Sequence, residues 1–220
     1  MFILHGYWRS SAVYRVRCAL ELKGIPYEVR PVSLIANGGE QLQDDYRALN
    51  PMAEVPSLSF VTPSGEAVTL AQSVAILEYL EEVRPEVPLL PRDPVARAQV
   101  RQLVEGVNSG IHPHQNLKVL KRLTAVFGTD QAANEEWCRH WIVGGFAGLE
   151  VLVARHGGHH AFGDTPTLAD CALVPQIYNA RRYKVEMADF PRLSAVWAAA
   201  TALPAFLRAA PEVQPDAPKS

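Results

Sequence analysis

The residues best placed for chemistry are two adjacent serines, Ser10 and Ser11, between a short apolar run and a helix-like run. One hydroxyl at such a junction is explained as an N-cap, which accepts a hydrogen bond from a free backbone N–H. A helix N-terminus also carries partial positive charge and can stabilise an anion. A serine that donates a hydrogen bond there, with Arg9 beside it, would lower the pKa of a thiol. None of the three cysteines lies at this junction, so the thiol would belong to a ligand.

Two other stretches offer groups to the same kind of ligand. In "EVPSL", Pro56 has no N–H, while Val55 before it can present both backbone groups to an extended peptide. An ordinary proline at a strand edge is the alternative. In "LAQSVAIL", Gln72 and Ser73 begin a helix, where a hydroxyl acts either as an N-cap or as part of a carboxylate site. A thiol at one junction and a carboxylate at the other fit glutathione, whose γ-glutamyl group carries such a carboxylate.

The remaining polar motifs indicate structure more than chemistry. His112 and His114 are separated by a helix-breaking proline, with no acidic or cysteine partner nearby, so no metal site is expected. "HGGHH" at 156–160 is interpreted as a flexible loop. Thr167 and Asp170 form a capping box with a purely structural role.

Composition narrows the class of protein. The chain has 220 residues, a formal net charge of −2 and 48% hydrophobic residues, so a packed core is expected. No basic stripe favours a nucleic-acid partner, and no run is long and apolar enough to favour a membrane. The N-terminus does not resemble a signal peptide, and three widely spaced cysteines favour a reducing, cytoplasmic location.

Periodicity predicts the elements that must position these residues. Strands are expected at 2–5 and 27–34, with Pro31 putting the latter at a sheet edge, and a hairpin at 55–61 and 67–71. Helices are expected at 11–23, 39–51 and 73–83, which gives the order β-α-β-α-β-β-α. Prolines at 85, 88, 91 and 94 then indicate a stiff linker. Helical patterns follow at 95–113, 135–155, 167–183 and 191–210, and the tail 211–220 is expected to be loosely ordered.

The sequence also resembles a known family. The stretches "YWRSSAVYRVRCALELKGIPYE", "GGEQLQDDYRALNPMAEVPSL", "GIHPHQNLKVLK" and "FGDTPTLADCALVPQIYNARRYKVE" resemble zeta-class glutathione transferases, and in particular their maleylacetoacetate and maleylpyruvate isomerases. The resemblance implies an α/β thioredoxin-like, glutathione-binding domain over 1–83 and a linker over 84–91. It also implies an all-α, substrate-binding domain over 92–220, and a homodimer.

The resemblance assigns roles to individual residues. Ser10 matches the serine that bonds the thiolate, with Ser11 as its neighbour, and Val55 with Pro56 matches the backbone anchor of the cysteinyl group. Gln72 and Ser73 match the γ-glutamyl carboxylate site. The other implied positions are Gln41 near the glycine end of glutathione, His112, Gln115 and Asn116 on a helix turned toward the ligand, and Arg9 and Arg182 as cationic grips for substrate carboxylates.

The implied function is the glutathione-dependent cis–trans isomerisation of maleylacetoacetate to fumarylacetoacetate in tyrosine and phenylalanine catabolism, by reversible thiolate addition to the alkene. Maleylpyruvate isomerisation in gentisate catabolism and general zeta-class transferase activity stay open. Ala12 stands where many members have a cysteine, which argues against a mechanism that uses a protein thiol. Leu117 and Lys118 are closer to the maleylacetoacetate type. A thiol–disulfide oxidoreductase would need Cys18, two turns into a packed helix, and a non-catalytic module would not need the serine or the Val-Pro pair.

Overall fold

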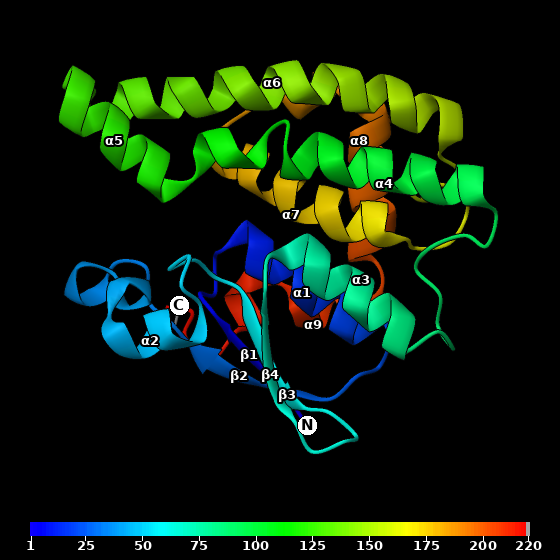
Figure 1. Ribbon diagram of the computed structural model, residues 1–220. Coiled ribbons are helices and arrows are strands. Elements are labelled where there is room, and N and C mark those ends of the chain that lie inside the picture. Colours follow the sequence, from blue (N-terminus) through cyan, green and yellow to red (C-terminus); the bar gives the residue numbers. More distant parts are fainter. Residues whose placement is uncertain (219–220) are drawn as a thin grey trace. The chain divides into compact units, whose positions relative to one another are not determined.

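The computed structural model describes residues 1–218 (Figure 1). It divides into two compact units: Met1–Leu89 together with the segment that begins at Ala202, and Leu90–Thr201. The domain boundaries at 83 and 92 stay a prediction. The C-terminal segment, however, groups with the first unit, although its helical pattern had assigned it to the helical domain.

The first unit is built on a four-stranded mixed sheet with the order β2-β1-β3-β4. β1 and β2 are parallel, whereas β3 is antiparallel to both β1 and β4. The predicted β-α-β-α-β-β-α order is confirmed, and Pro31 does lie in an edge strand. The elements are β1 (Phe2–Gly6), α1 (Ser11–Leu22), β2 (Tyr27–Pro31), η1 (Ala36–Gly38), η2 (Glu40–Leu42), α2 (Asp44–Leu49), β3 (Ser57–Val61), β4 (Ala67–Ala71) and α3 (Ser73–Val83).

α1 is the central helix of this unit and is buried from Ser11 to Leu20. It approaches β1 so closely that a Cβ at Gly6 would lie 2.5 Å from Val13 Cγ1, so only glycine fits there. The core around it consists of side chains with no exposed surface: Leu4, Val16, Leu20, Leu58, Ile76, Leu77 and Leu80. The helix therefore holds its N-terminus, and Ser10 before it, in a fixed position relative to the sheet.

The linker after α3 is fastened by a buried ion pair. Lys23 Nζ lies 2.7 Å from Glu81 Oε2 and also donates to the carbonyls of Arg84 and Val87. The same carboxylate oxygen accepts the N–H of Leu89 at 2.9 Å. This one lysine thus joins the end of α1, the end of α3 and the linker.

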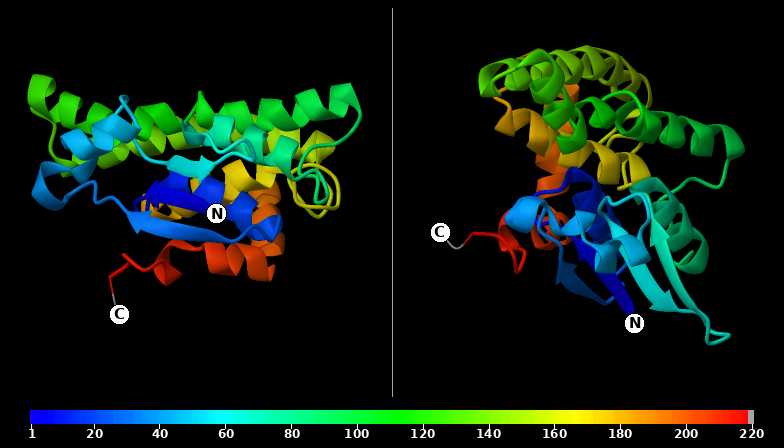
Figure 2. Two further views of the ribbon diagram at one scale, coloured as in Figure 1. Left: turned by 60° about the horizontal axis from the view of Figure 1, so that its bottom comes forward. Right: turned by 60° about the vertical axis from the view of Figure 1, so that its left-hand side comes forward.

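The C-terminal segment packs on α1 as α9 (Pro204–Ala209), followed by η5 (Pro211–Val213) (Figure 2). The single helical run predicted at 191–210 is therefore two helices. The prediction of a loosely ordered tail is wrong for the part that the structure describes. Gln214 is buried, and its Nε2 donates to the carbonyls of Arg208 and Ala210.

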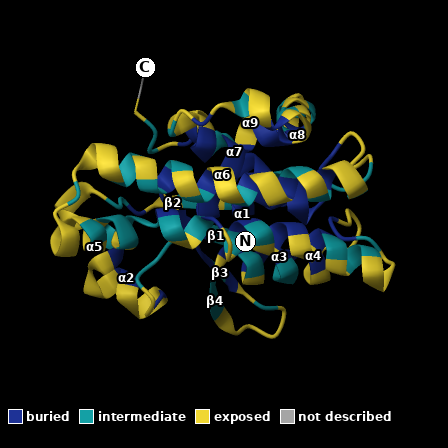
Figure 3. Ribbon diagram, turned by 90° about the horizontal axis from the view of Figure 1, so that it is seen from above, coloured by how far each residue is buried: buried dark blue, intermediate teal, exposed yellow. Residues whose placement is uncertain are grey.

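The second unit is helical, and the most deeply buried of its helices is α7 (Figure 3). α7 packs on α4 and α8, and α6 packs on both of these helices. α5 was not predicted. The elements are α4 (Pro94–Asn108), η3 (His112–Gln115), α5 (Leu117–Phe127), α6 (Gln131–His156), α7 (Leu168–Arg182), η4 (Met187–Asp189) and α8 (Pro191–Thr201).

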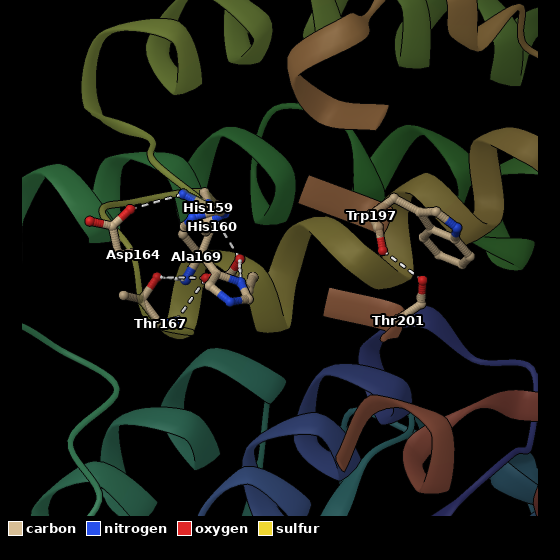
Figure 4. A network of polar contacts seen from close by, with 9 residues as sticks. His159, His160, Asp164, Thr167, Ala169, Trp197 and Thr201 are labelled. Atoms are coloured by element: carbon tan, nitrogen blue, oxygen red, sulfur yellow. Dashed lines mark hydrogen bonds and ion pairs between the residues drawn. The ribbon is translucent and has the colours of Figure 1, made fainter. Parts of the chain in front are cut away.

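The predicted capping box of α7 is confirmed (Figure 4). Asp170 Oδ2 accepts the N–H of Thr167 at 2.8 Å, while Oδ1 accepts the N–H of Ala161 at 3.0 Å and lies 3.2 Å from His160 Nδ1. The loop predicted to be flexible is thus held at one end, because His160 is buried against this carboxylate.

Candidate functional site

The sheet brings four of the predicted segments to one of its ends. Gly6 lies opposite Pro31, so β1 and β2 end there, and the antiparallel pairs His5–Ser57 and Ser57–Ala71 make β3 begin and β4 end there. The connections at this end carry Ser10 and Ser11 after β1, Gln41 after β2, Val55 and Pro56 before β3, and Gln72 and Ser73 after β4.

Ser10 is the N-cap of α1. Its Oγ accepts the N–H of Val13 at 3.3 Å, and its own N–H donates to the carbonyl of Tyr7 at 3.0 Å. As an acceptor, the hydroxyl still has its proton to donate to another group. No acidic residue lies in the first turn of α1, so nothing within that turn neutralises the positive end of the helix. Capping and anion stabilisation are therefore compatible at Ser10, while Ser11 is the first, buried residue of the helix.

The segment before Val55 is held by hydrogen bonds to the carbonyl of Glu54. Tyr46 Oη and Asn50 Nδ2 both donate to it at 2.7 Å, and Tyr46 Oη lies 2.9 Å from Ser57 Oγ. The Val55–Pro56 peptide bond is cis. Val55 precedes the first paired residue of β3, so its backbone groups lie outside the sheet ladder.

Gln72 has an unusual backbone, with φ of 69° and ψ of 115°, in a region that residues other than glycine seldom adopt. Such outliers cluster at functional sites. Its Nε2 lies 3.4 Å from Glu54 Oε2, which links this turn to the segment before β3.

Ser73 is the first residue of α3 and not its N-cap. It is 4% exposed, and its Oγ accepts a hydrogen bond from Arg15 Nη1 at 3.1 Å. α3 has no side-chain cap and no acidic residue in its first turn. The N–H groups that begin a helix have no partner within it, so this turn can bind a carboxylate. Arg15, which was not selected from the sequence, adds a buried cation behind it.

Gln41 is buried, and its Oε1 has no hydrogen-bond partner among the residues that the structure describes. A buried amide oxygen without a donor is costly unless a ligand or water supplies one. Gly39 lies beside it with φ of 115°, and a Cβ there would come within 2.8 Å of the Gln41 amide. The positive φ of this residue is what favours glycine at position 39.

The predicted residues of the second unit are engaged with their own neighbours. Gln115 is buried, and its Oε1 accepts from Gln176 Nε2 at 3.3 Å and from Asn179 Nδ2. Asn116 is the N-cap of α5, with Oδ1 accepting the N–H of Lys118 at 3.0 Å. His112 begins η3. The sequence did not single out Gln176 and Asn179, because their part in this cluster arises from packing.

The two predicted cationic grips are both exposed arginines. Arg9 lies with its guanidinium 5.3 Å from the ring centroid of Trp8, in the first unit. Arg182 ends α7 in the second unit, with its guanidinium 4.7 Å from the ring of Tyr183. Both keep a planar fork suited to a carboxylate, and their roles stay predictions.

The protein's own thiols are poorly placed for chemistry. Cys18, Cys138 and Cys171 are buried and form no disulfide. Burial raises the pKa of the Cys138 thiol, the reverse of what a reactive thiolate needs. Within residues 1–218, no group of three or more His, Cys, Asp or Glu side chains could hold a metal ion, and no helix is long and apolar enough to cross a membrane.

Comparisons with known proteins show the family to which the chain belongs. Models of the glutathione S-transferase N-terminal and C-terminal domains match residues 9–83 and 131–209. A probable maleylacetoacetate isomerase of Drosophila melanogaster is 45% identical, covering 98% of this chain and 90% of its own. A holo maleyl pyruvate isomerase, a bacterial glutathione S-transferase of the zeta class, is 45% identical with a TM-score of 0.92, covering 98% of this chain and 100% of its own.

A third relative has been solved with ligands. The maleylacetoacetate isomerase of Anaeromyxobacter dehalogenans 2CP-1, with glutathione in its active site, is 47% identical with a TM-score of 0.90, covering 99% of this chain and 98% of its own. The same enzyme has been solved with dicarboxyethyl glutathione and citrate in the active site. The chain therefore belongs to the glutathione S-transferase family and, within it, to the zeta-class group of maleylacetoacetate and maleylpyruvate isomerases.

Proposed function

We propose that this protein is a glutathione-dependent cis–trans isomerase that converts maleylacetoacetate to fumarylacetoacetate in the catabolism of tyrosine and phenylalanine. The observation that supports it most is the gathering of Ser10, Val55 and Ser73 at one end of the sheet. These positions offer a hydroxyl donor, free backbone groups and a helix N-terminus. They suit the thiol, the peptide backbone and the γ-glutamyl carboxylate of glutathione.

The residues fit glutathione in detail. Ser10 Oγ is already an acceptor for Val13, which leaves its proton for the sulfur. Ser73 and the first turn of α3, with Arg15 behind them, suit the γ-glutamyl carboxylate. The buried Oε1 of Gln41 lacks a donor within the described chain and can accept a ligand N–H.

Bound glutathione supplies a thiolate that adds reversibly to the alkene of the substrate and is regenerated after rotation about that bond. The chain has to do two things for this chemistry. Ser10 and the positive end of α1 keep the sulfur anionic at neutral pH. Arg9 and Arg182 pair with the carboxylates of the substrate and orient it.

The direct test is to mix the purified protein with maleylacetoacetate, with and without glutathione, and to measure both isomerisation and remaining glutathione. Conversion that requires glutathione without consuming it supports the proposal. Steady loss of glutathione to an electrophile, with no isomerisation, would instead favour a general zeta-class transferase on the same scaffold.

Maleylpyruvate is the second candidate substrate, favoured by the resemblance to maleyl pyruvate isomerase at 45% identity. Both substrates place a cis alkene between a carboxylate and a carbonyl, so the same groups would serve either. Comparing kcat/KM for the two substrates in one assay ranks them. A higher value for maleylpyruvate would reassign the physiological reaction.

We also propose a cytoplasmic homodimer. The family resemblance supports the dimer, and the three cysteines without disulfides suit a reducing compartment. Light scattering after size-exclusion chromatography measures the oligomeric state, and a mass close to 24.2 kDa would mean a monomer.

A further inference from the structure

The turn between β1 and α1 is held by the far end of the chain. The N–H of Trp8 donates to Asp216 Oδ2 at 2.9 Å, across a separation of 208 residues. The carbonyl of the same residue accepts from Arg17 Nη2 at 2.9 Å. Both backbone groups of Trp8 are therefore engaged, one by the C-terminal segment and one by α1.

Arg17, on α1, also binds the C-terminal segment. It is 1% exposed, and its Nε donates to the carbonyl of Ala209, at the end of α9, at 2.8 Å. Burial lowers the pKa of Arg17, and the charge of Asp216 acts in the opposite direction. The guanidinium stays protonated at any physiological pH, so its fork bridges Trp8 and α9 permanently.

The clamped residue leads directly into the candidate site. Arg9 follows Trp8 and lies over its ring, and the N–H of Ser10 donates to the carbonyl of Tyr7, on the other side of Trp8. A shift of the Trp8 backbone would therefore move Arg9 and Ser10 together. Small displacements matter here, because a hydrogen bond to a thiolate weakens steeply with distance and angle.

The two oxygens of Asp216 differ in their surroundings. Asp216 Oδ1 is buried and has no hydrogen-bond partner among the described residues. Among the described residues, the N–H of Trp8 is therefore the group that this carboxylate binds.

We propose that Asp216 and Arg17 are positioning residues, which clamp Trp8 so that Ser10 and Arg9 face the glutathione sulfur correctly. The inference rests on the proposed function of Ser10. It makes the C-terminal segment part of the machinery that sets the acidity of bound glutathione.

The test compares three variants with the wild type. Asp216→Ala removes the acceptor, Asp216→Asn keeps an acceptor oxygen without the charge, and Arg208→Gln is the matched control. Arg208 ties the same segment to α1 through Glu21 at 2.6 Å without touching the turn at Trp8. The thiolate of bound glutathione is followed by its ultraviolet absorbance as a function of pH, together with kcat and KM for glutathione.

Asp216→Ala should raise the pKa of the bound thiol by about one unit, which means an ionisation constant about tenfold smaller. Asp216→Asn should show a smaller shift, and Arg208→Gln none. A chain that ends at Gln214 also removes the carboxylate but keeps α9. If Asp216→Ala does not fold, this shortened chain should show the expected rise in the pKa of the bound thiol.

A wild-type pH profile in folded Asp216→Ala, or in the shortened chain, would overturn the inference, as would an equal shift in Arg208→Gln. Isomerisation by the wild-type protein distinguishes a failure of this inference from a failure of the proposed function. If it shows no glutathione-dependent isomerisation, the proposed function is wrong. If it isomerises and Asp216→Ala matches it, only the positioning role is wrong.

Discussion

At the scale of single residues, the Ser10 hydroxyl caps α1 and can serve a second partner. Its oxygen caps α1 and its proton is left for a ligand. Ser10→Ala should therefore lower turnover about a hundredfold, the usual cost of losing one donor to a developing or stabilised charge. It should also lower the free energy of unfolding by about 1 kcal/mol, since a cap is lost. Steady-state kinetics and urea unfolding measure the two effects.

The control for this prediction is a cap remote from the chemistry. Asp93 caps α4, with Oδ1 accepting the N–H of Ala96 at 2.8 Å. Asp93→Ala should lose similar stability and keep its turnover. A folded Ser10→Ala protein with normal turnover would remove Ser10 from the mechanism.

Arg182 offers a second prediction at this scale. If its guanidinium pairs with a substrate carboxylate, Arg182→Ala should raise KM for the diacid about tenfold or more, the usual value of a charge-assisted bond. KM for glutathione should stay constant. The neighbouring Arg181 lies over the ring of Trp197 at 4.7 Å and provides the matched control, because Arg181→Ala should leave KM unchanged. An unchanged KM in both variants would exclude Arg182 from substrate binding.

Residues with local signatures could be found in the sequence, whereas residues defined by distant partners could not. Ser10, Val55 and Ser73 each stand in a short motif at the end of an element. Arg15 meets Ser73 across 58 residues. Its position in an apolar helical run indicates burial, but nothing in the sequence indicates its partner.

At the scale of elements, the start of α7 depends on one buried carboxylate. Asp170→Ala would leave the N–H groups of Thr167 and Ala161 without their acceptor, and each buried unpaired donor costs about 1–3 kcal/mol. We expect a loss of at least about 2 kcal/mol in the free energy of unfolding. Asp164→Ala is the control: Asp164 is exposed and accepts only the N–H of His159 in the same loop among the hydrogen bonds shown in Figure 4. Equal losses in the two variants would contradict the special role of Asp170.

The buried ion pair between Lys23 and Glu81 predicts a larger effect on stability. Lys23→Ala would leave the buried Glu81 carboxylate without its cation, which typically costs about 3–5 kcal/mol. Replacing the pair together, as Lys23→Met with Glu81→Leu, should recover much of this loss. The exposed pair Arg30 and Glu28 is the comparison, since Arg30→Ala should change stability by less than about 1 kcal/mol. Thermal unfolding of these three variants and the wild type measures the differences.

The sequence predicts helices well where the apolar period and an N-cap agree, as in α1 and α7. α5 was not among the predicted helices; it starts after Asn116, whose side chain is its N-cap. The break between α8 and α9 was overlooked because Pro204 sits in the first turn of a new helix, where proline is tolerated. Both differences concern the place where a helix starts, at Asn116 for α5 and at Pro204 for α9.

At the scale of the whole molecule, the first unit is assembled from both ends of the chain. A fragment of residues 1–89 would expose the face of α1 that α9 covers, and Arg17 would lose the carbonyl of Ala209. We expect this fragment to unfold without a cooperative transition. Adding a peptide of residues 202–218 should restore cooperativity, as measured by circular dichroism during thermal unfolding. A cooperative transition in the fragment alone would show that the first unit does not need its C-terminal segment.

The clamp on Trp8 also sets the order in which the protein can be completed during synthesis. Its contacts span 208 and 192 residues, so they cannot form until Ala209 and Asp216 have left the ribosome. Long-range contacts of this kind form late, because the chain must first lose the entropy of closing a large loop. A nascent chain would therefore carry its serine junction in an unfinished state while the helices of the second unit are already folding. Translation has to pass Asp216 before the serine junction near the start of the first unit can take its final form.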